Sequence, residues 1–120
     1  MKNKSFFHRM GFALQGIGTG LLRESSLRQQ AAAAALVLAV LVWRRPAPVW
    51  WALLIVNCGV VLAAELMNTA LEETLDHLSP ELHPAVKRAK DSAAGAVLVL
   101  SFTAVATFIA FLAATFRTGP

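Results

Sequence analysis

Long uncharged stretches alternate with short polar segments along the chain. The stretches are residues 29–43, 49–64 and 92–116. A helix needs about 20 apolar residues to cross the hydrocarbon core of a bilayer. The first stretch is long enough if residues 25–28 are added and the side chain of Arg28 extends to the lipid headgroups. The pattern therefore predicts three membrane-spanning helices, at about residues 26–43, 49–70 and 92–116.

The N-terminal segment, at about residues 5–22, has a different pattern. Its apolar positions step by three and four, which is the period of an amphipathic helix lying in the plane of the membrane surface. These positions are Phe7, Met10, Leu14, Ile17 and Leu21. Glycine lowers helix propensity, so a break is expected near residues 18–20. The alternative for this segment is a mobile tail.

Caps and prolines predict where the spanning helices begin and end. Ser25 or Ser26 can cap the first helix, and the RRPAP sequence at 44–48 ends it. The second helix is expected to run to about Leu78, where Ser79 and Pro80 close it. The segment 79–90, SPELHPAVKRAK, is predicted to be a polar loop, with Asp91 and Ser92 capping the third helix.

Composition agrees with a membrane protein. Hydrophobic residues make up 57%, charged residues 15%, and the mean hydropathy is +0.58. The net charge of +4 comes from basic residues that flank apolar stretches, without interleaved aromatic residues. This arrangement favours contact with lipid headgroups and phosphates over binding to nucleic acid. The single cysteine, Cys58, has no partner for a disulfide and is interpreted as a packing residue.

Basic residues are concentrated on one side of the predicted spans. Those of the N-terminal segment and of segment 79–90 are Lys2, Lys4, Arg9, Arg23, Arg28, Lys87, Arg88 and Lys90. Those on the opposite side are Arg44, Arg45 and Arg117. The excess of Lys and Arg marks the cytoplasmic side, so the N-terminus and segment 79–90 are predicted to be cytoplasmic.

Four polar residues follow the second uncharged stretch directly: Glu65, Asn68, Glu72 and Asp76. At 100° per residue they lie on one stripe of a helix. Ionisable groups at membrane depth cost about a few kcal/mol each and indicate a functional site. Glu65 is a candidate general base that accepts a proton from a substrate hydroxyl. The structural alternative is a hydrogen-bonding group between helices.

The polar residues of the cytoplasmic side suit a metal-bound nucleotide. Clustered carboxylates provide the hard oxygen ligands that Mg²⁺ prefers. Lys90 next to them can complement phosphate, and a helix beginning at Asp91 would add backbone N–H groups. The sequence has no P-loop and no kinase-type glycine loop. A solvated mixture of surface charges is the alternative.

The motifs ELMNTALEETLD at 65–76, HP at 83–84 and AKDSAAGAV at 89–97 resemble the signature of the small bacterial integral-membrane diacylglycerol kinase family, which includes undecaprenol kinases. The resemblance covers nearly the whole chain. It implies an all-α membrane protein with an amphipathic surface helix and three transmembrane helices, assembled as a homotrimer with shared active sites. It also implies MgATP-dependent phosphorylation of a lipid hydroxyl on the cytoplasmic side of the bacterial cytoplasmic (inner) membrane.

The resemblance also implies roles for individual residues. Glu65 would be the general base, Glu24 and Glu72 the metal ligands, and Asn68 and Asp76 supporting residues. The implied nucleotide contacts are Phe12, Glu24, Glu72, Glu81, Leu82, His83, Lys90 and Asp91. The implied lipid contacts are Ser26, Leu27, Arg28, Gln29, Gln30, Glu65 and Ala94.

Two positions depart from the family pattern. Ser5 stands where better-known members have a basic nucleotide contact, and Phe12 stands where a tyrosine is expected.

Taken together, the polar stripe and the resemblance predict a lipid kinase acting on diacylglycerol or on a polyprenol such as undecaprenol. The alternative is a small membrane channel or proton-relay subunit, in which Glu65 and Glu72 carry protons without kinase activity.

Overall fold

The computed structural model describes residues 3–81 and 83–118, and in this part of the chain all regular secondary structure is α-helical. The helices are α1 (Phe6–Arg23), α2 (Ser25–Arg44), α3 (Pro48–Leu78) and α4 (Pro84–Thr118). Three of them, α2, α3 and α4, are long and apolar enough to cross a membrane. The predicted fold class, a surface helix followed by three spans, is confirmed, and the chain is a membrane protein.

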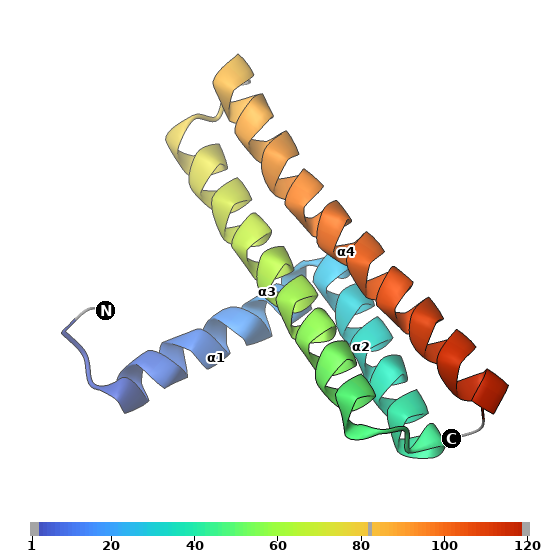
Figure 1. Cartoon of the computed structure of the whole chain (residues 1–120). Coiled ribbons are helices and arrows are strands. Elements are labelled where there is room, and N and C mark those ends of the chain that lie inside the picture. Colours follow the sequence, from blue (N-terminus) through green and yellow to red (C-terminus); the bar gives the residue numbers. More distant parts are fainter. Residues whose placement is uncertain (1–2, 82, 119–120) are drawn as a thin grey trace.

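Helix α3 is the centre of the arrangement (Figure 1). Helix α4 runs antiparallel to α3 and forms a hairpin with it. Helix α2 packs against the N-terminal half of α3. In the described residues the backbones of α2 and α4 both pack on α3 but do not approach each other closely. Helix α1 leaves the bundle at a wide angle, as expected for a helix in the membrane surface.

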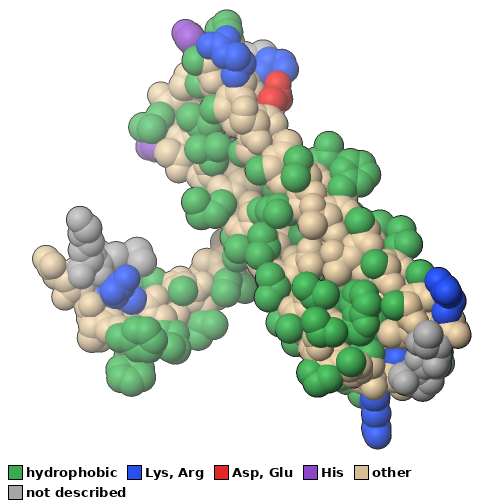
Figure 2. All heavy atoms as spheres, in the orientation of Figure 1, with side chains coloured by type: hydrophobic (Ala, Val, Ile, Leu, Met, Phe, Trp, Pro, Cys, Tyr) green, Lys and Arg blue, Asp and Glu red, His purple; other side chains and the backbone are tan. Residues whose placement is uncertain are grey.

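A small apolar core lies at the end of the bundle near the α2–α3 turn. Leu41, Leu54 and Phe111, one from each spanning helix, are almost fully buried there. Arg44 links α2 to α4 at this end, because its Nη2 donates to the carbonyl oxygen of Thr115 at 2.9 Å. Most other large apolar side chains are exposed. On the face in Figure 2 they cover the middle of the bundle, while basic side chains gather at its ends, as expected for helices surrounded by lipid.

The lengths of α2 and α3 determine where the acidic stripe lies relative to α2. Helix α2 has 20 residues and α3 has 31, which correspond to roughly 30 Å and 46 Å at 1.5 Å per residue. The start of α2 lies beside the middle of α3, since Gln30 contacts Glu65. The part of α3 after Glu65 therefore extends past the start of α2.

The expected break of the N-terminal helix at its glycines is wrong, because α1 continues without interruption to Arg23. Gly20 is buried where α1 meets α2 and α3. A Cβ atom added at this glycine would lie 2.8 Å from Cδ2 of Leu27 and 3.3 Å from Cδ2 of Leu66. The packing of this helix end outweighs the low helix propensity of glycine.

Two expected caps are also wrong. Residue Glu24 is the N-cap of α2 and makes no side-chain cap hydrogen bond, so Ser25 lies inside the helix. Helix α4 begins at Pro84 rather than at Asp91, because proline suits the first turn of a helix. The ring Nδ1 of His83 accepts a hydrogen bond from the backbone N–H of Ala85 at 3.0 Å. The backbone at Asp91 is thus inside α4 and offers no free N–H groups to a phosphate.

Candidate active site

The carboxylate of Glu65 is buried between the three spanning helices. Its side chain extends from α3, and the residue is only 5% exposed. From α2, Nε2 of Gln30 donates to Oε1 of Glu65 at 3.5 Å. A buried carboxylate in the middle of a long apolar helix is unusual and marks Glu65 as a candidate functional residue.

The next turns of α3 carry an amide and a second carboxylate. The Nδ2 atom of Asn68 donates to Oε1 of Glu72 at 3.4 Å, so these two residues do share one stripe. The Oδ1 atom of Asn68 is buried and accepts no hydrogen bond from the described residues. Amide and carboxylate oxygens are donors that Mg²⁺ takes, but here the amide turns Nδ2 and not Oδ1 toward Glu72.

At the far end of the stripe, the ammonium group of Lys90 on α4 pairs with the carboxylate of Asp76 on α3. On α4 itself, Nζ of Lys87 lies 2.7 Å from Oδ2 of Asp91. The hairpin thereby brings Lys90 to the carboxylate stripe, whereas Lys87 pairs within α4. Cations at this position can neutralise phosphate oxygens.

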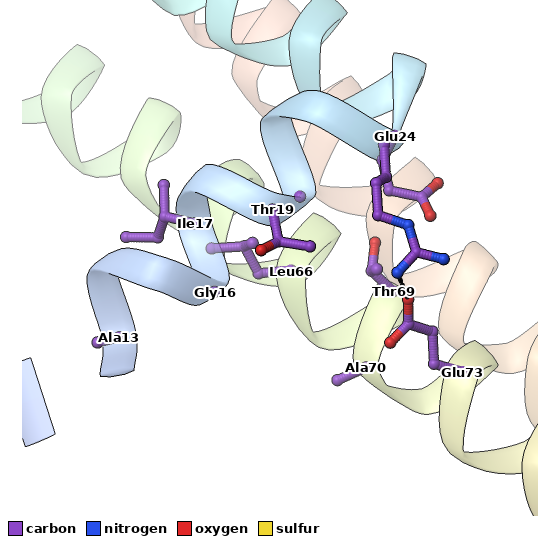
Figure 3. A pocket seen from close by; sticks show the side chains of 11 residues that line it. Ala13, Gly16, Ile17, Thr19, Glu24, Leu66, Thr69, Ala70 and Glu73 are labelled. Carbon is purple, nitrogen blue, oxygen red and sulfur yellow. Dashed lines mark ion pairs between the residues drawn. The ribbon is translucent and has the colours of Figure 1, made fainter. Parts of the chain in front are cut away.

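Glu24 lies in a pocket of about 520 Å³ between α1 and α3 (Figure 3). Thr19 and Thr69 line the same pocket, and Oε1 of Glu73 lies 3.6 Å from Nη1 of Arg23 at its wall. Within one chain Glu24 thus shares a pocket with Glu73 rather than with Glu72. Among residues 3–81 and 83–118, no three Asp, Glu, His or Cys side chains are placed to hold a metal ion.

Comparison with known proteins identifies the family. A family model described as prokaryotic diacylglycerol kinase matches residues 11–112. The chain belongs to this family. It is similar to the diacylglycerol kinase of Escherichia coli strain K12, with 29% identity over 85% of this chain and 84% of the relative. It is also similar to the undecaprenol kinase of Bacillus subtilis, with 37% identity over 82% of this chain and 76% of the relative.

In this member of the prokaryotic diacylglycerol kinase family, the stretch expected to contact lipid is spread around α2. Leu27 is buried against Gly20 of α1. The Nη1 atom of Arg28 donates to the carbonyl oxygens of Leu21 and Leu22 at 2.9 and 3.0 Å, so it caps the end of α1. Ser26 and Gln29 are exposed, whereas Gln30 turns to Glu65.

The remaining expected contacts lie at the surface of the chain. Phe12 is 40% exposed on α1, and Ala94 is exposed on α4. Glu81 and His83 are exposed in the α3–α4 turn, close in sequence to Lys90 and Asp91 on the same hairpin end. Leu82 lies outside the described residues.

Sequence reasoning missed Ser101 on α4. Its Oγ accepts a hydrogen bond from Nε2 of Gln30 at 3.2 Å. Both residues line a groove of about 270 Å³ between α2 and α4, whose other walls include Ala33, Ala104 and Phe108. A serine inside a long uncharged stretch gives no sequence signal of its own, since only the packing of α4 on α3 brings it near Gln30 and Glu65.

Proposed function

We propose that this protein is an ATP-dependent lipid kinase of the bacterial cytoplasmic membrane, with its active site on the cytoplasmic side. Its acceptor would be the hydroxyl group of diacylglycerol or of undecaprenol, giving phosphatidic acid or undecaprenyl phosphate. The observation that carries the proposal is the position of Glu65. This carboxylate is buried where the membrane-embedded part of the bundle meets a hairpin end rich in oxygen donors and lysines.

The reaction would proceed where the bilayer meets water. The lipid hydroxyl reaches Glu65 from the bilayer while ATP approaches from the cytoplasm, so no soluble lid domain is needed. The hydroxyl oxygen forms a bond to the γ-phosphorus, the bond from that phosphorus to the ADP oxygen breaks, and the hydroxyl proton passes to the Glu65 carboxylate. Such a transfer depends mainly on positioning and on neutralisation of charge.

Mg²⁺ is the proposed cofactor, and when bound it would neutralise the ATP phosphates. Glu72 and the unpartnered Oδ1 of Asn68 supply oxygen donors for it, and Glu24 is the third proposed donor. Lys90, now paired with Asp76, would turn to the phosphates when nucleotide binds. Phe12, Glu81, His83 and Asp91 remain the proposed further contacts to the nucleotide.

A homotrimer with shared sites is part of the proposal. Within one chain, Glu73 and not Glu72 lines the pocket of Glu24. A neighbouring subunit that brings its own Glu24 beside Glu72 would complete the set of oxygen donors.

Both acceptors are supported by relatives, because the chain is 29% identical to a diacylglycerol kinase and 37% identical to an undecaprenol kinase. The test is transfer of labelled phosphate from ATP, with Mg²⁺, by purified protein in bilayers that contain either lipid. Wild type, Glu65→Gln and Thr74→Val are compared. Thr74 is an exposed α3 residue whose hydroxyl, among the described residues, donates to Ala70 of its own helix, so its variant controls for substitution on α3.

Transfer to one lipid by wild type and Thr74→Val, lost by Glu65→Gln, would support the kinase and identify its acceptor. No transfer to either lipid by wild type would contradict the proposed function. Normal transfer by Glu65→Gln would contradict the assignment of the general base.

A further inference from the structure

The side chain of Gln30 joins all three spanning helices at one point. Its Nε2 donates to Oε1 of Glu65 on α3 at 3.5 Å and to Oγ of Ser101 on α4 at 3.2 Å. An amide NH₂ group has two hydrogens, and these contacts use both of them. The amide of Gln30 is therefore oriented by two partners, and the contact to Ser101 is the shorter one.

We propose that Gln30 and Ser101 are positioning residues that hold the Glu65 carboxylate in the orientation needed for proton acceptance. The inference rests on the proposed lipid kinase function. The hydrogen bond from the amide to Oε1 limits rotation of the Glu65 carboxylate, and Oε2 is the proposed acceptor of the proton of the lipid hydroxyl. Small errors in the placement of such a group lower the rate strongly.

The location of the contact supports a role in the reaction. Gln30 and Ser101 line the groove between α2 and α4, which is otherwise walled by apolar side chains such as Val37, Val105 and Phe108. An apolar chain lying in this groove would have its polar end at the Gln30–Ser101 contact. The hydroxyl of the acceptor would then meet Glu65 next to the residues that orient it.

Ser101 acts through Gln30 and not on the carboxylate directly. With alanine at this position, one hydrogen of the half-buried amide would have no acceptor, and such a group turns toward another partner. Glu65 would then lose the donor on Oε1. Threonine keeps the hydroxyl and should keep the amide in place, because its Oγ1 can occupy the position of the serine Oγ.

The experiment measures kcat and the KM for ATP of Ser101→Ala, Ser101→Thr, Gln30→Leu and the Gln30→Leu/Ser101→Ala double variant, with whichever lipid the wild type uses. The control is Thr103→Val, on the same helix, since Thr103 is exposed and donates to Val99 of its own helix. Midpoints of thermal unfolding are recorded for every variant.

Loss of one hydrogen bond to an ionised group corresponds to about a tenfold effect or more. We expect kcat to fall about tenfold or more in Gln30→Leu and about fivefold in Ser101→Ala, with KM for ATP unchanged. Ser101→Thr and Thr103→Val should stay within about twofold of wild type. The double variant should be no slower than Gln30→Leu alone, because both substitutions remove the same function.

Wild-type rates in Ser101→Ala, or additive losses in the double variant, would overturn the positioning role while leaving the kinase itself established. A lower unfolding midpoint in Ser101→Ala that matches its loss of rate, without rescue by threonine, would show a structural role and also overturn it. Inactivity of the wild type is a separate result, which contradicts the proposed function.

Discussion

The ammonium group of Lys90 and the carboxylate of Asp76 form an ion pair that joins α4 to the end of the acidic stripe on α3. The side chain of Asp76 is 64% exposed and that of Lys90 is 30% exposed. Ion pairs at such exposed positions contribute about 0–1 kcal/mol to stability. The pair therefore matters little for folding, and it holds a cation beside the carboxylates of the proposed nucleotide site.

Substitution of Lys90 by methionine is expected to raise the KM for ATP about tenfold, because a charge-assisted contact to phosphate is lost. The matched control is Arg88→Met, since Arg88 is an exposed cation two positions away on the same helix. Steady-state phosphoryl transfer at varied ATP concentration measures the change. Equal KM values for Lys90→Met and wild type would remove Lys90 from the nucleotide site.

Substitution of Asn68 by leucine, or of Glu72 by glutamine, is expected to raise the Mg²⁺ concentration needed for half-maximal activity about tenfold. Each change removes a hard oxygen donor from the pair on α3, and loss of one ligand or its close support costs about 10- to 100-fold in affinity. Activity is titrated with Mg²⁺ at constant free ATP. Unchanged titration curves for both variants would place the metal elsewhere.

Substitution of Gly20 by valine is expected to lower the unfolding midpoint and to loosen α1 from the bundle. A side chain at Gly20 meets Leu27 and Leu66, whereas Gly18 has nothing within 4 Å of an added Cβ atom. Overpacking of this kind costs about 1–3 kcal/mol, so Gly18→Val is the control for propensity. Equal midpoints for the two valine variants would show that the close approach at Gly20 does not stabilise the structure.

The proposed orientation predicts which turn faces the cytoplasm. In a Cys58→Ser background, Ala85→Cys at the start of α4 should react with a membrane-impermeant thiol reagent in inside-out vesicles only. Ala47→Cys, in the α2–α3 turn, should react in intact cells with a permeabilised outer envelope. Both alanines are exposed, so access is decided by the side of the membrane. The reverse labelling would place the proposed active site on the other side.

The hydrophobic pattern was sufficient for most of the fold. Uncharged stretches of spanning length and the RRPAP and Ser79–Pro80 sequences predicted three spanning helices, because a helix in lipid must satisfy its backbone internally and proline cannot continue it. Features of the helices that depend on packing, such as the continuity of α1, were not predictable. The glycines of α1 suggested a break, yet the helix runs to Arg23, and at Gly20 the side chains of Leu27 and Leu66 lie so close that a larger residue would not fit without a shift.

For the candidate site, the sequence by itself determined the stripe of Glu65, Asn68 and Glu72, because their spacing fixes a common helix face. It also supported a lysine near this stripe. Only the tertiary structure decided the partners across helices: Gln30 and Ser101 at Glu65, and Asp76 at Lys90. Side chains 14 to 71 positions apart in the sequence meet at these contacts, and no helical period relates them. Their meeting is set by the depth and rotation at which α2 and α4 pack on α3.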